Sequence, residues 1–197
     1  MPDDGSRSET THTVVQELLR HLESLGSTRL NLGCGRQKLE DWINVDKNHN
    51  NNPDLLWDLE YLPWPLADNS VDAVLACHVL EHISDLIGVI GELWRVCRPG
   101  AEVLIVVPYG SSDDAWDAPQ HKRSFFPNTL QYFNRNIYRV PGTVGYGAEE
   151  NMQVDFGVVS VTLVPYPEFL NDRELEWKTR HLRNIIREMR VMLVVRK

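Results

Sequence analysis

The chain has 197 residues, of which 42% are hydrophobic and 24% charged, and this composition suits one globular domain with a single core. The formal net charge of −8 argues against general nucleic-acid binding or a membrane partner. Three scattered cysteines, Cys34, Cys77 and Cys97, exclude a disulfide scaffold and favour a reducing compartment. The polar N-terminus lacks the apolar segment of a secretory signal, so we expect a cytoplasmic protein.

Taken in chain order, residues 1–12 form a polar lead-in, and residues 13–197 are expected to form a single domain. Within it we distinguish a first half, 13–108, from a second half, 109–197. An apolar stripe between Val14 and Leu25 predicts an opening helix. Short apolar runs bounded by turn residues then predict seven strands, near residues 30–32, 42–45, 55–57, 71–77, 103–107, 154–164 and 191–195.

Two further helices are predicted between the later strands. Ser84 is expected to cap the first of them, which ends at residues 98–100. Its apolar face comprises Leu86, Ile90, Leu93, Trp94 and Cys97. The apolar residues Leu175, Thr179, Leu182, Ile185 and Ile186 mark a last helix. Strands that alternate with helices predict an α/β three-layer fold with a mainly parallel sheet, although the first connections have no room for full helices.

Small and acidic residues follow each of the first four predicted strands. They are Gly33-Cys34-Gly35, Asp46, Asp58 and Cys77-His78, in that order. The carboxyl ends of parallel strands meet at one edge of a sheet, where ligands bind. Glycines let a ligand approach the backbone, one acid can accept both hydroxyls of a ribose, and another can accept an adenine amino group. The alternative is that these are simple turn residues, which the ordered set makes the weaker interpretation.

The ordered set resembles the class I S-adenosylmethionine-dependent methyltransferases over residues 28–108. The resemblance also covers residues 62–65, 71–72, 78–83 and 98–100. It implies a Rossmann-like fold with seven strands and S-adenosyl-L-methionine as cofactor. It departs from the family pattern at Asn31, where an acid is usual, and at Gln37, where a third glycine is common. The implied cofactor-binding residues are Asn31, Gly33, Cys34, Gly35, Asp46, Lys47, Asp58, Leu59, Cys77 and His78.

Two other enzyme classes share fragments of this pattern. Residues 78–82 match the H-x-x-E-H motif of one zinc-protease class, but that motif belongs in a long helix, and here it follows a buried strand. A nicotinamide-binding domain would need a glycine where Lys38 stands, and a longer spacing to Asp46. We therefore expect neither a metal nor a nicotinamide cofactor.

The acceptor is expected to bind against the segment that follows the fifth strand. His121 is the candidate general base, Arg123 can hold an anionic group, and His78 lies beside the cofactor. Similar methyltransferases often carry a His-x-Arg-x-Phe segment here, which residues 121–125 match. At least half of the aromatic side chains between Tyr109 and Phe133 are expected to be core residues.

Residues 171–197 carry eight basic and four acidic side chains, a net charge of +4, so residues 1–170 carry −12. We interpret them as an exposed helix face with pairs such as Glu174–Lys178 and Glu176–Arg180, rather than as a phosphate-binding surface. The predicted activity is in-line transfer of a methyl group to a small-molecule or nucleotide-type acceptor. The alternative is a catalytically silent methyltransferase-like subunit that binds a partner protein or a second copy.

Overall fold

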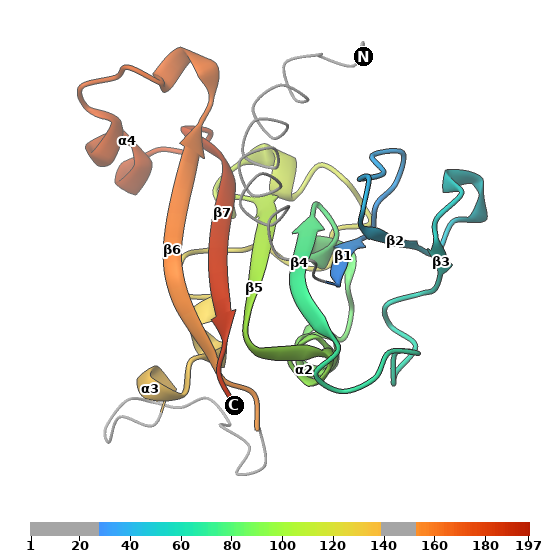
Figure 1. Cartoon of the computed structure of the whole chain (residues 1–197). Helices are drawn as coiled ribbons and strands as arrows, with labels where there is room; N and C mark the ends of the chain where they lie inside the picture. Colours follow the sequence, from blue (N-terminus) through green and yellow to red (C-terminus); the bar gives the residue numbers. More distant parts are fainter. Residues whose placement is uncertain (1–27, 139–152) are drawn as a thin grey trace.

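A computed structural model describes residues 28–138 and 153–197, so the lead-in and the helix predicted within residues 13–25 lie outside the described residues. Seven strands form one sheet in the order β3-β2-β1-β4-β5-β7-β6, which Figure 1 shows from β3 on the right to β6 on the left. The strands are β1 (Arg29–Leu32), β2 (Ile43–Asp46), β3 (Leu55–Leu56), β4 (Val71–Cys77), β5 (Cys97–Pro108), β6 (Phe156–Pro165) and β7 (Ile186–Val195).

The sheet is mainly parallel, as predicted. Neighbouring strands among β1 to β5 run parallel, and β7 runs antiparallel to both β5 and β6. The connections between the first strands are short, as the sequence indicates. The β1–β2 connection contains no helix, and β2 and β3 are joined through a single 3₁₀ turn, η1 (His49–Asn51). The seven-stranded, Rossmann-like sheet with reduced helices between its first strands is therefore confirmed.

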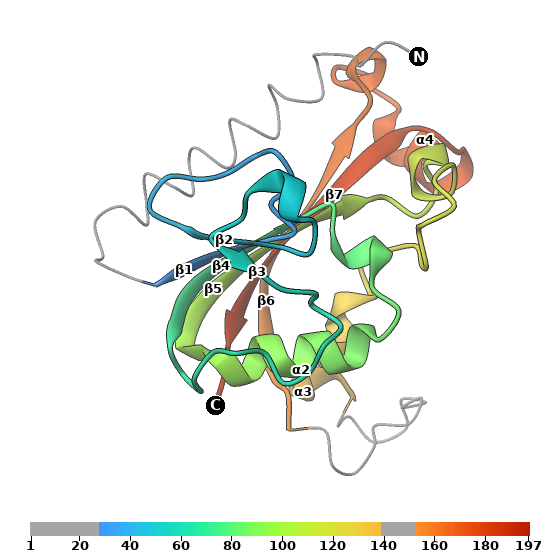
Figure 2. The same cartoon turned by 90° about the vertical axis from the view of Figure 1, so that its right-hand side faces the viewer.

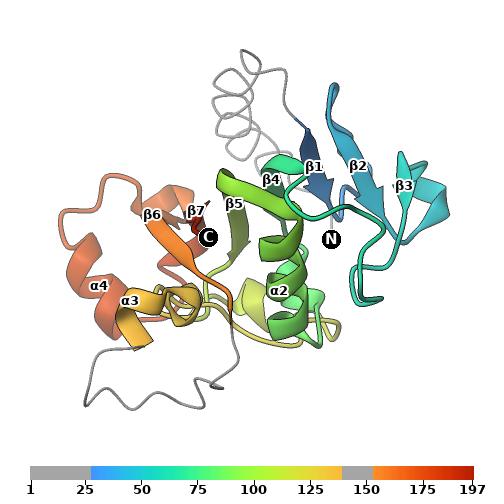
Figure 3. The same ribbon diagram turned by 60° about the horizontal axis from the view of Figure 1, so that its bottom comes forward.

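The helices of the described residues are few and short. They are α2 (Leu86–Val96), α3 (Arg135–Tyr138) and α4 (Leu175–His181), together with the 3₁₀ turns η2 (Leu80–His82), η3 (Asp113–Ala115), η4 (Leu130–Phe133) and η5 (Pro167–Phe169). Helix α2 lies against one face of the sheet (Figure 2), whereas α3 and α4 lie beside β6 and β7 (Figure 3). No helix among these residues has the length and apolarity that crossing a bilayer requires.

The main core lies between the sheet and α2. Leu86, Val89, Ile90, Leu93 and Val96 form the buried face of the helix, and they pack in one cluster with side chains of β1, β4, β5 and β7. A smaller cluster around Trp42, Leu75 and Leu104 covers the other face. Among the predicted aromatic core residues, Tyr109, Phe125 and Phe133 are buried, whereas Trp116 and Phe126 are exposed.

Helix α2 begins one residue later than predicted. Its N-cap is Asp85, whose carboxylate accepts from the Gly88 N–H at 2.9 Å, while the Ser84 N–H donates to Glu60. The prediction of Ser84 as the cap is therefore wrong. The helix ends at Val96, and residues 98–100 belong to an irregular start of β5, where the register with β4 shifts between Val71 and Ala73. Cys97 is accordingly a strand residue.

The last helix is shorter than predicted and stops at His181. Asn184 adopts a left-handed backbone conformation with φ of 56°, and its side chain bonds to the backbone and carboxylate of Asp113. These long-range bonds turn the chain into β7, so Ile185 and Ile186 enter the sheet core instead of a helix. The predicted pairs Glu174–Lys178 and Glu176–Arg180 are confirmed at 3.7 and 2.7 Å.

Candidate active site

A cavity of about 830 Å³ opens where the carboxyl ends of β1 to β4 meet. Its volume lies in the range of small-molecule sites. Its wall is formed by the residues just after those strands and by a loop that follows β5. The lining residues are Gly33, Asp46, Lys47, Trp57, Asp58, Leu59, Glu60, His78, Val79, His82, Ile83, Ser84, Pro119, Gln120 and Lys122.

The turn after β1 requires glycine at two positions. Gly33 and Gly35 have φ of 62° and 52°, in the left-handed region that other residues rarely adopt. A Cβ at Gly33 would lie 2.5 Å from a methyl group of Val79, whereas a Cβ at Gly35 would meet nothing within 4 Å. The turn therefore packs tightly against the β4 end at Gly33 and leaves the backbone approachable at Gly35.

Asp46, at the end of β2, has a carboxylate with only half of its hydrogen-bond acceptor capacity occupied. One oxygen accepts from the Gly35 N–H at 2.8 Å, and the other accepts from the Asn48 N–H at 2.7 Å. Each carboxylate oxygen has two lone pairs, so each keeps one for a further donor. Two backbone bonds thus fix the orientation of a group that can still accept both hydroxyls of a diol.

The end of β3 supplies an acid, an aliphatic and an aromatic side chain to the same wall. The Asp58 carboxylate accepts from the Glu60 N–H at 3.1 Å and lies 3.5 Å from the Lys47 ammonium. Leu59 is buried in the main core. The indole N–H of Trp57 donates to the Tyr61 carbonyl at 3.1 Å. Lys47 and Asp58 thus bridge the ends of β2 and β3.

Four predicted cofactor residues, Asn31, Cys34, Gly35 and Cys77, are absent from the lining of this wall. The buried Asn31 amide donates to the Gln37 carbonyl and to Asn44, so it ties the β1–β2 connection together. Cys34 is buried, and its pKa is raised chiefly by that burial. Burial also raises the pKa of Cys77 to about 12, so both thiols stay protonated at neutral pH.

His78 lies at the β4 end between two buried acids. Its Nε2 is 3.3 Å from Glu188 and its Nδ1 is 3.4 Å from Glu81, and its backbone is left-handed with φ of 51°. Burial alone would lower its pKa, but the bonds to Glu188 and Glu81 outweigh that effect and raise the pKa to about 9. The ring is therefore an imidazolium at neutral pH, and it cannot accept a proton from a substrate in that form.

The acceptor-side loop is tied to the turn after β4. The Lys122 N–H donates to the Glu81 carbonyl at 2.7 Å. Arg123 donates to the carbonyls of Ile83 and Ser84 at 3.0 and 2.5 Å, so its guanidinium holds backbone. His121 Nδ1 lies 3.1 Å from the Ala115 carbonyl. The structure thus brings His121 beside the cavity wall, while Arg123 serves the loop's attachment.

Parts of this chain are similar in sequence or in fold to known methyltransferases. Residues 40–105 match the family model of a methyltransferase domain. A curated malonyl-[acyl-carrier protein] O-methyltransferase of Yersinia pestis is 33% identical over an alignment of 95 residues that covers 42% of this chain and 35% of that protein. A solved S-adenosylmethionine-dependent methyltransferase from Archaeoglobus fulgidus superposes with a TM-score of 0.60 at 18% identity, covering 92% of this chain and 93% of its own.

Residues 40–105 are thus similar to a methyltransferase domain, and the fold is that of solved S-adenosylmethionine-dependent methyltransferases. The chain spans about a third of the length of the curated methyltransferases that it matches. The solved [4+2]-cyclase SpnF has a similar fold, with a TM-score of 0.59 at 14% identity over 92% of this chain and 80% of that one. The methyltransferase fold is therefore also found in a protein whose name specifies another reaction.

The residues around the cavity fit S-adenosylmethionine, the cofactor that the sequence resemblance implies. The approachable backbone at Gly35, the half-used carboxylate of Asp46 and the wall of Trp57, Asp58 and Leu59 offer partners to a nucleoside. The predicted residues Gly33, Asp46, Lys47, Asp58, Leu59 and His78 line the cavity.

Sequence reasoning missed several residues of the cavity wall. Trp57, Glu60 and Val79 follow strands that it had identified, so reading one residue further along each strand end could have found them. Pro119, Gln120 and Lys122 give no comparable signal. Their place depends on the Lys122–Glu81 backbone bond, which joins segments about forty residues apart.

Proposed function

We propose that this chain transfers a methyl group from S-adenosylmethionine to a small-molecule or nucleotide-type acceptor by in-line displacement. The observation that carries the proposal is Asp46, whose carboxylate is fixed by two backbone bonds, lines the cavity and keeps a lone pair on each oxygen. A carboxylate held in this way suits the two ribose hydroxyls of the cofactor.

The other wall residues complete the binding site in this proposal. Asp58 accepts the adenine amino group, and Leu59 and Trp57 provide apolar contact for the adenine ring. The cofactor supplies a sulfonium that is a good leaving group, so the protein's task is to position the acceptor and to exclude water. Few protein groups need to take part in bond making.

The acceptor lies on the side of His121 and Lys122 in this proposal. The Nδ1 of His121 is used by the Ala115 carbonyl, which leaves the Nε2 lone pair for an acceptor proton or a cation. His78 is protonated and Arg123 is bound to backbone, so both act as positioning residues rather than as a base or an anion clamp.

Calorimetric titration of S-adenosylmethionine into the full chain tests the proposal. We expect saturable binding, and Asp46→Ala should weaken the affinity by about 10- to 100-fold, because charged hydrogen bonds are lost. Glu176→Ala is the control, since it removes an exposed acid on α4, far from the wall in sequence and outside the lining residues. Absence of binding at several hundred micromolar cofactor, or an unchanged affinity in Asp46→Ala, would refute the assignment.

Binding alone does not separate an enzyme from a silent subunit. Turnover of the cofactor against pools of metabolites and nucleosides does so, and carboxylate and hydroxyl acceptors belong in the pool because the curated relatives are O-methyltransferases. We expect release of S-adenosylhomocysteine that depends on one acceptor class. Tight cofactor binding without turnover in any pool would favour the silent, partner-binding subunit.

A further inference from the structure

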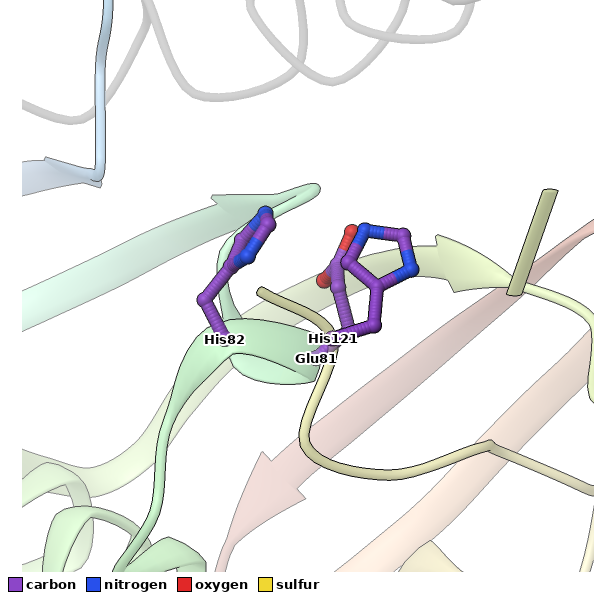
Figure 4. Close-up of side chains that lie close together, drawn as sticks. All are labelled: Glu81, His82 and His121. Atoms are coloured by element: carbon purple, nitrogen blue, oxygen red, sulfur yellow. The ribbon is translucent and has the colours of Figure 1, made fainter. Parts of the chain in front are cut away.

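Three potential metal ligands gather beside the cavity without a role in cofactor binding. Glu81 and His82 lie on η2, and His121 lies on the loop after β5. One ligand atom from each side chain lies within 4.8 Å of the other two. Figure 4 shows the three side chains projecting to the same side of the two segments. Two imidazoles and one carboxylate are a donor set that divalent transition metals favour.

The carboxylate of Glu81 is buried with half of its bonding capacity unused. The residue is only 2% exposed, and its Oε1 lies 3.4 Å from His78 Nδ1. Its Oε2 is also buried and has no hydrogen-bond partner among the described residues. Burying a charged oxygen without a partner is costly, so buried carboxylates are normally paired or bound to a metal. His78 faces only Oε1, so Oε2 keeps its full capacity to accept a further ligand.

His121 is oriented as metal-bound histidines commonly are. Its Nδ1 bonds to the Ala115 carbonyl at 3.1 Å, which places the proton on Nδ1 and the lone pair on Nε2. In Figure 4 the other ring nitrogen lies on the side of Glu81. The rings of His82 and His121 meet edge to face, with their centroids 4.8 Å apart. The lone pair of His121 is thus directed to the place where the other two donors gather.

The two segments are joined by bonds that use none of the three side chains. The Lys122 N–H donates to the carbonyl of Glu81, and Arg123 donates to the carbonyls of Ile83 and Ser84. These bonds involve only backbone acceptors of the η2 region. The loop and the turn are therefore held in register before any ion binds, which lowers the ordering cost of binding.

We propose that Glu81, His82 and His121 bind one divalent transition-metal ion, with zinc as the best fit, at the wall of the cavity. Tetrahedral zinc places its ligand atoms roughly 3.3 Å apart, so the cluster must close from its widest separation of 4.8 Å. His82 is exposed and can make most of that movement. This set differs from the H-x-x-E-H protease motif, because His78 is bonded to two acids instead.

Three protein ligands leave a tetrahedral ion with one open position. His82 lines the cavity, so that position is accessible from it. If the proposed methyl transfer holds, the open position would take an oxygen or nitrogen atom of the acceptor and lower the pKa of its proton. Metal binding itself does not depend on methyl transfer, and it can be measured without the cofactor.

Titration of zinc into the metal-free, untagged full chain by calorimetry tests the site. We expect one ion per chain. His82→Ala and His121→Ala should each weaken binding by more than the roughly 10- to 100-fold that loss of an outer partner costs. His181→Ala is the matched control, since this exposed histidine lies on α4 and bonds to the Trp177 carbonyl. It should leave the affinity unchanged.

Cobalt gives a second readout that does not depend on heat. We expect the visible absorption of four- or five-coordinate Co²⁺ in the wild type, and its loss in the double variant His82→Ala/His121→Ala. Circular dichroism establishes that the variants are folded, and S-adenosylmethionine calorimetry reports separately on the proposed function. No uptake of either ion by the wild type, or equal uptake by the double variant, would overturn the metal site.

Discussion

Gly33 has no room for a side chain, so the turn after β1 should tolerate substitution poorly at this position. Its φ is 62°, and an added Cβ would lie 2.5 Å from Val79. We predict that Gly33→Ala destabilises the protein by about 2–4 kcal/mol, the combined cost of left-handed strain and overlap with Val79. Equilibrium unfolding in urea measures this change in the free energy of unfolding.

Gly91 provides the matched control for that substitution. It lies in the middle of α2, where an added Cβ would meet nothing within 4 Å. Gly91→Ala should therefore stabilise the protein by about 0.5–1 kcal/mol, because alanine loses less backbone entropy in a helix. Equal losses of stability in the two variants would show that the turn after β1 is not under the constraint described.

At the level of single residues, the sequence predicts position best where a residue directly follows a strand. Gly33, Asp46 and Asp58 each stand just after a buried apolar run, so their place at one sheet edge follows from local pattern and parallel topology. Asn31 also stands at a strand end, but a bond to Asn44 turns its side chain into the structure. That choice depends on a partner thirteen residues away, which the local pattern does not reveal.

At the level of elements, Ser84 and Asp85 are adjacent candidates for the N-cap of α2, and the structure shows that Asp85 is the cap. Asp85 accepts from the Gly88 N–H, and Ser84 does not cap the helix. We predict that Asp85→Ala lowers stability by about 1 kcal/mol, whereas Ser84→Ala changes it by less than about 0.5 kcal/mol. Urea midpoints of the two variants at neutral pH provide the comparison, and a larger loss in Ser84→Ala would contradict the assigned cap.

A second element-level contact joins α2 to the turn before β4. Glu92 accepts from the Trp64 N–H at 2.8 Å and from Arg95, and Arg95 also bonds to Asp68. The Arg95 guanidinium, helped by the Trp64 N–H, lowers the pKa of Glu92 below its ordinary 4.5. The stabilising contribution of Glu92 is therefore complete above about pH 4.5 and is lost as the pH falls through the lowered folded-state pKa.

Glu92→Gln should consequently cost about 1 kcal/mol at pH 7, and the difference from wild type should shrink as the pH falls below 4.5. Urea unfolding at a series of pH values measures it. Glu176→Gln is the control, because its pair with Arg180 is exposed and contributes little at any pH. A Glu92→Gln difference that stays constant down to pH 3 would mean that Glu92 does not titrate with a lowered pKa.

The boundary between α4 and β7 shows why some elements resist prediction. Leu182, Ile185 and Ile186 continue the helical spacing of Leu175, so periodicity alone extends the helix. The chain leaves the helix because Asn184 bonds to Asp113, a residue about seventy positions earlier. Ile186 then pairs with Pro165 of β6 and is buried. Long-range hydrogen bonds determine where α4 ends, and the local sequence pattern does not reveal them.

At the level of the whole molecule, half of the eight basic side chains of residues 171–197 form close ion pairs with acids. The close ion pairs are Lys178–Asp172, Arg180–Glu176, Arg183–Asp113 and Arg190–Glu188, each between 2.6 and 2.7 Å. Several of these side chains belong to β7 or its approach rather than to a helix, so the predicted basic helix face is much reduced.

We accordingly predict no retardation of duplex or single-stranded DNA at about 50 mM salt, because paired charges release few counterions and the whole chain carries −8. Gel retardation and fluorescence anisotropy at two salt concentrations test this. A shift that weakens steeply with salt would show that these basic residues contact phosphate after all.

The place of β7 in the sheet has a consequence for the nascent chain. This strand is the last of the seven to be synthesised, yet it lies between β5 and β6, and β6 pairs with no other strand among the described residues. Until β7 leaves the ribosome, β5 has an open edge and β6 has no partner. Exposed edges of this kind recruit other chains. Synthesis that pauses before residue 186 should therefore yield an aggregation-prone intermediate, which makes translation speed over this last stretch a determinant of yield.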